Sequence, residues 1–329
     1  RCGLCSRADR CNDYSKHVRR ESEGMQITNK ILENVSYKTT RGLMLHGEAG
    51  EILTGNASKD LLGKVQLIFT SPPFLLNTKK RYGNLQGEEY LEWFTSFASV
   101  FKKLLKKNGS IVIELGNAWE PRKPIMSPLV TKALLKFLEA GEFNLCQQFI
   151  YYNTARVPGP AQWVNIERIR VKDSFTHIWW MSKSERPKAD NRRILKEYSA
   201  SMKRLLRTGK YNAGNRPSQH QMGTTSFLRD NKGAIPSNVL SIPNTKSSDD
   251  YLNYCRENKY KPHPARMPIQ VAEFFIKFLT TPKELVLDPF AGSNTTGLAA
   301  DKLKRRWISI ELNPSYIESS KGRFQDLIV

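Results

Sequence analysis

Short apolar runs alternate with amphipathic segments along most of this 329-residue chain. The runs typical of buried strands are GLMLHGE, VQLIFTS, GSIVIELG, ELVLD and WISIEL. Segments with helical periodicity separate them, at residues 88–105, 127–140, 267–280 and 295–303. In the first of these, one face carries Leu91, Phe94, Phe97, Ala98 and Phe101. Strands that alternate with helices predict an α/β fold with a mostly parallel sheet.

Two stretches break this pattern. Residues 1–24 are polar and charged without apolar periodicity, which predicts a disordered tail. Residues 161–262 are basic and interrupted by Gly and Pro, which is typical of an inserted recognition region. The sequence therefore divides into a tail, a first half of the α/β domain at 25–160, the insert, and a second half at 263–329.

Charge narrows the choice of partner. Lys and Arg number 52 against 31 Asp and Glu, a net charge of +21. Residues 151–232 alone contain 17 basic and six acidic residues. Such an excess favours a polyanionic partner, most often nucleic acid, although ribosome-associated and membrane-surface proteins share it. No run of 18 apolar residues is present, so the sequence predicts no membrane span.

Five cysteines stand at positions 2, 5, 11, 146 and 255. The last two are isolated, as in proteins of a reducing compartment. Cys2, Cys5 and Cys11, with His17 beyond them, begin like a zinc module. Their spacing matches no standard finger, and no apolar residues surround them, so a disordered tail is favoured and no metal site is predicted.

The strand ending at Thr70 runs directly into Ser71-Pro72-Pro73-Phe74. A Pro-Pro pair often marks only a stiff turn. Here, however, the turn follows the carboxyl end of a strand, where open parallel sheets bind ligands. Two prolines fix φ and donate no hydrogen bond, so they leave a rigid backbone with carbonyl acceptors. Such a turn suits a ligand with an exocyclic amino group.

A second turn follows the strand at 285–287, where Asp288 precedes PFAGSNTTG and a helix. No G-x-G-x-x-G can be written, and a carboxylate there repels phosphate, so a dinucleotide is not expected. Glu311, near the end of WISIEL, is placed to accept the hydroxyls of a ribose. A ligand with a ribose, a positive charge and an amino-acid tail is S-adenosyl-L-methionine. The alternative is that both carboxylates only cap helices.

Together, TSPPF and LDPFAGSNTTG resemble the amino-methylating DNA methyltransferases of the permuted β class, in which the catalytic motif precedes the cofactor motif. Ser-Pro-Pro-Phe resembles the cytosine-N4 branch, because adenine-N6 enzymes more often carry Asp-Pro-Pro-Tyr. The stretches YGNL, RIRVKD, RPS and HPAR extend the likeness, which runs from Gly42 to the carboxyl end. The resemblance implies a Rossmann-like fold with a circularly permuted, mostly parallel seven-stranded sheet and an inserted target-recognition region.

The resemblance also implies the cofactor site. Around the methionine part of S-adenosyl-L-methionine it places Asp288, Phe290, Gly292, Ser293, Asn294, Thr295 and Thr296. Glu311 binds the ribose, and Glu48 stands where the family usually has an aspartate against the adenine. The stretch HPARMP matches the motif that closes over the methionine end, with His263, Pro264 and Arg266.

In the implied reaction, the Ser71 hydroxyl and the Pro72 carbonyl accept the two hydrogens of a cytosine N4 amine, while Pro73 stiffens the turn. Glu114, near the end of SIVIEL, holds or deprotonates the serine, unless it is a solvated or capping residue. Phe74 and Tyr152 stack on opposite sides of the base, with Asn153 beside them in YYN. Core packing of either aromatic is the ordinary alternative.

The partner implied is double-stranded DNA with the cytosine flipped out of the stack. Phosphate contacts are expected from Lys79, Lys80 and Arg81, and base readout from Arg192, Arg193, Arg216, Gln219 and His220. A bacterial restriction-modification enzyme, monomeric or weakly dimeric and cytoplasmic, with a separate cognate endonuclease, is the expected context; a eukaryotic relative would be nuclear. The alternatives are adenine-N6 methylation, methylation of RNA or a glutamine side chain, and a catalytically silent nucleic-acid-binding relative.

Overall fold

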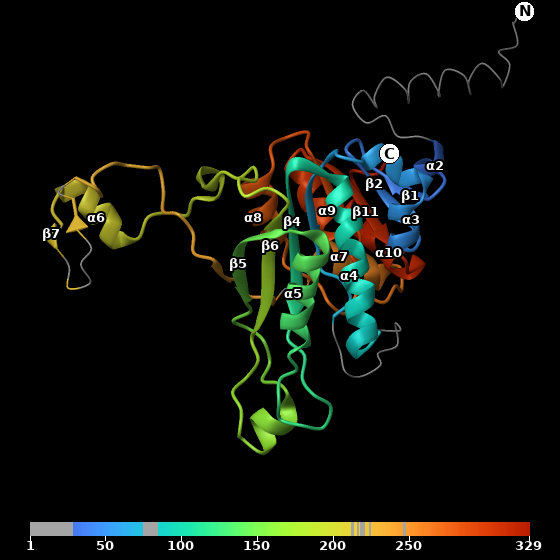
Figure 1. The fold of residues 1–329 in the computed structure, drawn as a ribbon, viewed down its shortest axis with the longest axis horizontal. Helices are drawn as coiled ribbons and strands as arrows, with labels where there is room; N and C mark the ends of the chain where they lie inside the picture. Colours follow the sequence, from blue (N-terminus) through green and yellow to red (C-terminus); the bar gives the residue numbers. More distant parts are fainter. Residues whose placement is uncertain are drawn as a thin grey trace, which may run out of the picture.

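In the computed structural model, a nine-stranded sheet forms the centre of the molecule (Figure 1). The structure describes residues 29–74, 85–211, 214–215, 217, 221–223, 225–245 and 248–329. In spatial order the strands are β1 (Val35–Lys38), β2 (Gly42–His46), β11 (Arg306–Glu311), β10 (Leu285–Asp288), β3 (Val65–Thr70), β4 (Leu105–Gly116), β6 (Phe175–Ser182), β5 (Asn144–Tyr152) and β9 (Val239–Ser241). Strands β2 to β4 in this order are parallel, and β6 is antiparallel to both neighbours.

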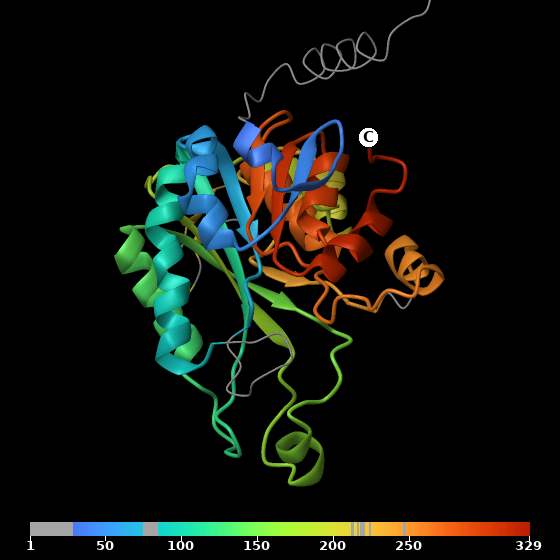
Figure 2. The ribbon, with the colours of Figure 1, turned by 90° about the vertical axis from the view of Figure 1, so that its right-hand side faces the viewer.

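Helices cover both faces of the sheet, as Figure 2 shows. One face packs against α2 (Asn29–Leu32), α3 (Ala49–Thr54), α4 (Gly87–Leu104) and α5 (Leu129–Gly141). The other packs against α8 (Ile269–Leu279), α9 (Thr295–Lys302) and α10 (Pro314–Ser320). Successive residues of β3 serve the two cores, since Ile68 belongs to the first cluster and its neighbours Leu67 and Phe69 to the second. The α/β fold predicted from the apolar pattern is thus confirmed.

The direction in which successive strands are added to the sheet reverses between the parallel strands β10 and β3. Helix α4 leads from β3 to β4 on one side, whereas α9 leads from β10 to β11 on the other. Crossovers that diverge in this way leave a crevice at the carboxyl ends of the two strands. The two motifs singled out in the sequence follow these same two strands.

The sheet has two more strands than the seven expected, because short β1 and β9 extend its edges. A larger difference concerns β6, which lies inside the region 161–262 assigned to target recognition. It pairs with both β4 and β5 in the middle of the sheet. Apolar and polar residues do not alternate clearly in its sequence FTHIWWMS, because both faces of the strand are covered. The alternation that reveals a half-exposed strand is therefore absent from it.

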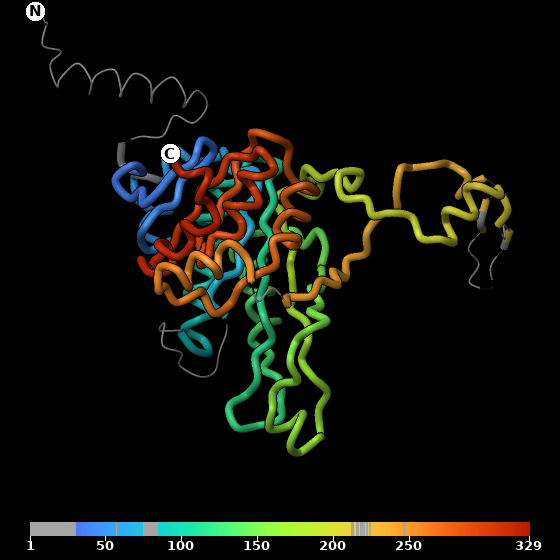
Figure 3. Tube along the Cα trace, turned by 180° about the vertical axis from the view of Figure 1, so that it is seen from behind, coloured from blue at the N-terminus to red at the C-terminus, as the bar shows by residue number. Residues whose placement is uncertain are grey.

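Two excursions leave the core. The described residues between 195 and 237 form an arm, seen apart from the core in Figures 1 and 3, with α6 (Ala200–Thr208), β7 (Gly214–Asn215) and β8 (Gln221–Met222). The second projection consists of the loop that follows β4 and the loop between β5 and β6, at the end of the sheet where the parallel strands have their carboxyl ends. The remaining elements are α7 (Asp250–Glu257), the short 3-10 helices η1 (Asn56–Leu61), η3 (Asn191–Ile194) and η4 (Lys321–Arg323), and the short π-helix η2 (Gln162–Ile166). Within the described ranges, no helix is long and apolar enough to cross a membrane.

Candidate active site

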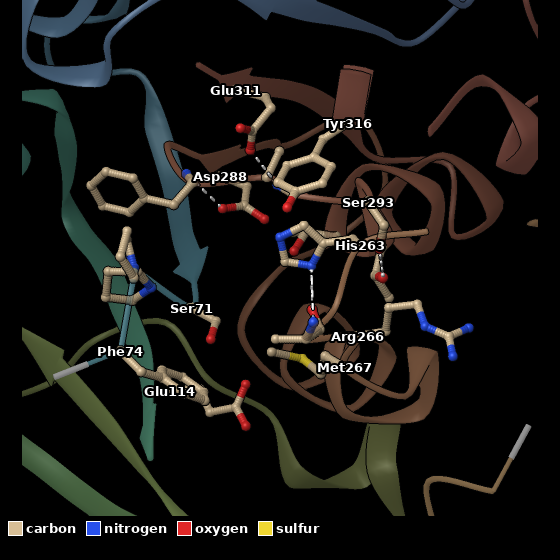
Figure 4. Close-up of a pocket in the computed structure, with 18 of the residues that line it drawn as sticks. Ser71, Phe74, Glu114, His263, Arg266, Met267, Asp288, Ser293, Glu311 and Tyr316 are labelled. Atoms are coloured by element: carbon tan, nitrogen blue, oxygen red, sulfur yellow. Dashed lines mark hydrogen bonds between the residues drawn. The ribbon is translucent and has the colours of Figure 1, made fainter. Parts of the chain in front are cut away.

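A cavity of about 930 Å³ opens at the carboxyl ends of β10, β11, β3 and β4 (Figure 4). It is lined by residues of both sequence motifs, including Ser71 and Asp288, and by Glu311 and His263. The two motifs are more than 200 positions apart in the chain, so only the parallel pairing of β3 with β10 brings them together. The crevice expected at the point of reversal therefore exists.

The Pro-Pro turn is held at both ends. At its start, the Thr70 hydroxyl donates to an Asp288 carboxylate oxygen at 2.7 Å. At its end, the hydroxyl of Tyr90, a fully buried residue of α4, donates to the Pro73 carbonyl at 2.8 Å. These two bonds and the fixed φ angles of the prolines make the turn rigid. Tyr90 was not predicted, because its place on the apolar face of α4 indicates only packing.

Glu114 lies beside Ser71 on the neighbouring strand β4. Its buried carboxylate accepts hydrogen bonds from the Ser71 hydroxyl and, at 2.9 Å, from the Thr176 hydroxyl. Burial raises the pKa of this carboxyl, although the two hydrogen bonds and the charge of Arg156 lower it in part. When Ser71 gives its hydrogen to Glu114, its oxygen lone pairs remain available to the cavity.

Asp288 ends the buried strand β10 and is itself buried. It accepts from Thr70, from the Phe290 backbone N–H at 3.1 Å, and from the Thr296 hydroxyl. Burial nevertheless raises the pKa of its carboxyl. A buried carboxylate is costly in free energy, so its retention at a cavity wall indicates a ligand with hydrogen-bond donors or positive charge.

Glu311 holds the glycine turn from the end of β11. One carboxylate oxygen accepts from the Gly292 N–H at 2.7 Å, and the other accepts from the Asn313 N–H at 2.8 Å. Burial is the main cause that raises the pKa of Glu311, and the negative charge of Asp288 adds to it. Gly292 has a φ of 52°, in the region that favours glycine.

The rest of the turn divides into lining and supporting residues. Ser293, Thr295 and Thr296 line the cavity. Asn294 does not; it caps α9 by accepting from the Gly297 N–H at 3.1 Å and from Ser309 Oγ at 2.7 Å. Asn294 was predicted to surround the cofactor with its neighbours; in the structure its amide oxygen is engaged inside the turn, where it supports the residues that line the cavity.

The segment that starts at His263 crosses the mouth of the glycine turn, and Pro264 and Arg266 also line the cavity. The His263 ring packs edge-on against Tyr316, with ring centroids 4.5 Å apart. A Cβ added to Gly292 would lie 3.1 Å from this ring, which is a second reason for glycine there. Burial lowers the pKa of His263, so the ring is neutral near pH 7.

Aromatic side chains form a second wall. Phe74 and Phe290 line the cavity together with Trp93 of α4, whose ring centroid lies 5.4 Å from that of Phe290. Glu48 also lines the cavity, and its carboxylate caps α3 by accepting from the Glu51 N–H at 2.7 Å. The cavity thus offers flat apolar surfaces next to carboxylates, which suits aromatic ring systems with polar edges.

Of the two neighbouring tyrosines, Tyr151 lines the cavity and Tyr152 does not. Successive strand residues face opposite sides, and residue 151 of β5 faces the same side as Glu114 and Thr176. Its buried hydroxyl has no hydrogen-bond partner among the described residues. Burial raises the pKa of Tyr151 to about 12, and the negative charge of Glu114 contributes. Asn153 also lines the cavity.

The expected base-reading arginines lie elsewhere. Arg193 donates to the backbone carbonyls of Lys277 and Thr280, at the amino ends of the strands and opposite the cavity. Arg192 is exposed and pairs with Asp190. Neither lines the cavity, because β6 runs away from it and carries the following segment to the far edge of the sheet.

Several predicted residues lie outside the residues that the structure describes. These are Lys79, Lys80, Arg81, Arg216, Gln219 and His220, and the amino-terminal group of Cys2, Cys5, Cys11 and His17. Across the described part of the chain, no cluster of three or more His, Cys, Asp or Glu side chains is arranged to hold a metal ion.

Comparison with known proteins agrees with this geometry. A family model described as DNA methylase matches residues 65–322. The type II methyltransferase M.PvuII of Proteus hauseri is 42% identical over 293 residues, covering 88% of this chain and 86% of the relative. The DNA adenine methyltransferase YhdJ of Escherichia coli is 25% identical over 288 residues, covering 84% and 83%.

Solved structures give the same result. A PvuII DNA methyltransferase described as cytosine-N4-specific superposes with a TM-score of 0.72 at 38% identity, covering 89% of each chain. The M1.HpyAVI-SAM complex superposes with a TM-score of 0.51 at 23% identity, covering 87% of this chain and 100% of that chain, and supports the fold alone.

Proposed function

The chain belongs to the family of N6/N4 DNA methylases, and from this premise we propose that it transfers a methyl group from S-adenosyl-L-methionine to the N4 amine of a cytosine in duplex DNA. The observation that carries the proposal is that Ser71, Glu114, Asp288 and Glu311 line the same cavity. We further propose that the enzyme works as a monomer or weak dimer, beside a separate cognate endonuclease.

Two observations favour cytosine over adenine. The turn carries serine at its first position, and this serine is hydrogen-bonded to a buried carboxylate. The relative with 42% identity, M.PvuII, shares its name with a solved structure described as cytosine-N4-specific, whereas the adenine methyltransferase YhdJ is 25% identical. Adenine-N6 methylation remains the second candidate, since an exocyclic amine presents the same two hydrogens in both bases.

The residues at the glycine turn fit S-adenosyl-L-methionine. Glu311 offers carboxylate oxygens for ribose hydroxyls, and buried Asp288 faces the region suited to the amino-acid end with Ser293, Thr295 and Thr296. His263, Pro264 and Arg266 cover this end, while Phe290, Trp93 and Glu48 line the other part of the same cavity. When bound, this cofactor supplies an electrophilic methyl group on a sulfonium sulfur.

The chain's contribution to the chemistry is the placement of acceptors. The cytosine N4 amine is a poor nucleophile because its lone pair is delocalised into the ring. The Ser71 oxygen and the Pro72 carbonyl accept its two hydrogens, which localises the lone pair and holds the nitrogen in position. Positive charge then grows on nitrogen, and dipoles fixed toward it stabilise the transition state more than the ground state. Glu114 takes up the released proton by way of Ser71.

The target base is proposed to lie between Phe74 and the polar wall formed by Glu114, Thr176 and Tyr151. Tyr151 replaces Tyr152 as the aromatic contact, since it is the tyrosine that lines the cavity. A base that is stacked and paired inside a duplex cannot enter this cavity, so the cytosine must leave the stack. The basic surplus of residues 151–232 attracts the DNA backbone, and binding should weaken with salt.

The deciding experiment digests DNA from cells that express the chain to nucleosides and separates them by mass spectrometry. N4-methylcytidine in the deoxy series is expected, and sequencing that detects modified cytosine then gives the recognition site. N6-methyladenosine without the cytosine product would transfer the proposal to adenine. No modified base in DNA, together with no cofactor binding by calorimetry, would favour a catalytically silent relative.

A further inference from the structure

Two loops at the carboxyl edge of the sheet form one projection, which we call the finger (residues 117–128 and 153–174). It extends from β4, β5 and β6 and appears at the bottom of Figures 1 and 2. Its root belongs to the cavity, since Asn153, Arg156 and Ser174 are lining residues. The finger therefore begins where the target base is proposed to bind and reaches outward from there.

Contacts between the two loops brace the finger. The rings of Trp119 and Trp163 lie 5.6 Å apart between centroids. Asp173 accepts from Trp119 Nε1 at 3.3 Å and from Asn117 Nδ2 at 2.7 Å, so each oxygen of its carboxylate is engaged. Arg170 Nε donates across to the carbonyl of residue 124 at 3.0 Å. Cross-links of this number give the projection a defined shape instead of leaving two separate loops.

Apolar side chains are exposed on this braced projection. Of the 18 large hydrophobic side chains that are exposed in the described part of the chain, six lie in the finger, at Ile125, Met126, Val157, Ile166, Ile169 and Val171. Val157 is 80% exposed, Ile166 69% and Val171 87%. The finger holds about a tenth of the residues, so the concentration is roughly threefold, and such clusters mark binding surfaces.

The finger has a net positive charge, which favours DNA as its partner. It contains six Lys or Arg residues and three Asp or Glu residues, and one of the acids, Asp173, is turned inward to its brace. A second copy of the chain would bring the same positive charge and repel it. Duplex DNA, in contrast, offers phosphates to the cations and base steps to the exposed apolar side chains.

We propose that the finger enters duplex DNA beside the target cytosine and that its exposed apolar side chains wedge into the base stack, which stabilises the extruded base in the adjoining cavity. This inference rests on the proposed DNA methylation, and it assigns the exposed apolar side chains of the finger to the extrusion of the target base. The stack opened by a flipped base loses apolar contacts, and aliphatic side chains replace them without needing hydrogen bonds.

The test compares two duplexes that carry the recognition site found by sequencing. In one, the target cytosine is paired; in the other, it faces an abasic position and is already free to leave the stack. The triple variant V157S/I166S/V171S should methylate the paired duplex at least about tenfold more slowly than the wild type, and the abasic duplex within about twofold. The three positions are exposed, so folding is preserved, and unchanged cofactor affinity verifies this. Single V171S serves as a milder second variant.

L135S is the matched control, because Leu135 is 60% exposed on α5 and does not line the cavity. It should leave both rates unchanged. Equal losses on the two duplexes, or no loss on either, would overturn the wedge. A change of sedimentation in the triple variant with an unchanged rate ratio would also overturn it and assign the finger to contact between copies. If the wild type methylates neither duplex, the proposed function itself has failed.

Discussion

The hydrogen bond between Ser71 and Glu114 makes a quantitative prediction. In the proposed reaction, Glu114 acts on the amine only through Ser71, because it is the serine oxygen that faces the amine. The perturbation is the pair of variants Ser71→Ala and Glu114→Gln, made singly and together. Glutamine keeps an acceptor for the Thr176 hydroxyl, so the second variant removes charge while leaving the local packing intact.

The magnitude follows from the number of acceptors lost. Ser71→Ala removes one of two preorganised acceptors, and loss of one such group costs about 10²–10³ in rate, or about 2.7–4 kcal/mol of transition-state stabilisation. Glu114→Gln should cost a similar factor. If the two residues act as one unit, the double variant is no slower than the slower single variant. If they act independently, the factors multiply to about 10⁴–10⁶.

The assay is single-turnover transfer of a labelled methyl group to a duplex that carries the recognition site, with enzyme in excess. Calorimetry with the cofactor and anisotropy with labelled DNA should give unchanged dissociation constants, which separates chemistry from binding. Thr176→Val is the matched control, since it removes the other donor to Glu114 and should slow the reaction less than Ser71→Ala. Multiplying factors in the double variant, or a Ser71→Ala rate within about threefold of the wild type, would refute the reasoning.

Three further outcomes are expected. Because burial raises the pKa of Glu114, the single-turnover rate should fall as pH drops through that pKa, and Glu114→Gln should lose this acidic limb; a limb that persists would assign it to another group. Because the pKa of Glu114 is higher in the folded chain than in the unfolded chain, the carboxyl increasingly destabilises the fold as the pH rises from the unfolded-state pKa through the folded-state pKa. Glu114→Gln should therefore unfold at a higher temperature near pH 7 and lose this advantage in acid, and thermal melts at both pH values would check it. Tyr90→Phe leaves the Pro73 carbonyl without its donor, so we expect about 1–3 kcal/mol less stability in denaturant unfolding and a lower rate with unchanged cofactor affinity; an unchanged rate would show that the prolines alone hold the turn.

The parts of the site that follow a strand directly could be read from the sequence. Ser71 and Asp288 each end a buried apolar run, and Glu311 ends a third. Because strand ends of a parallel sheet meet at one edge, local pattern was enough to place these three side chains in one region. The same reasoning found Glu114 at the end of β4 and the glycine turn before α9.

Other parts could not be read in this way. The sequence offered Tyr152 as the aromatic partner of the base, but the strand pleat turns Tyr151 to the cavity, and a shift of one residue exchanges the two faces. Strand β6 was hidden in a region that looked like an insert, because a strand covered on both faces shows no alternation. Arg192 and Arg193 were predicted to read bases because of their charge. The path of the chain after β6 places them at the edge of the sheet opposite the cavity.

By itself the sequence determined the alternation of strands and helices in the two halves of the domain, the two motifs with their rigid turns, and a positive charge suited to DNA, because these depend on residues close together in the chain. The tertiary structure decided which side chains share the cavity, that Tyr90 holds the Pro-Pro turn, and that two distant loops combine into a braced finger. Those features depend on register, on strand order and on contacts between distant segments, and local periodicity carries no information about them.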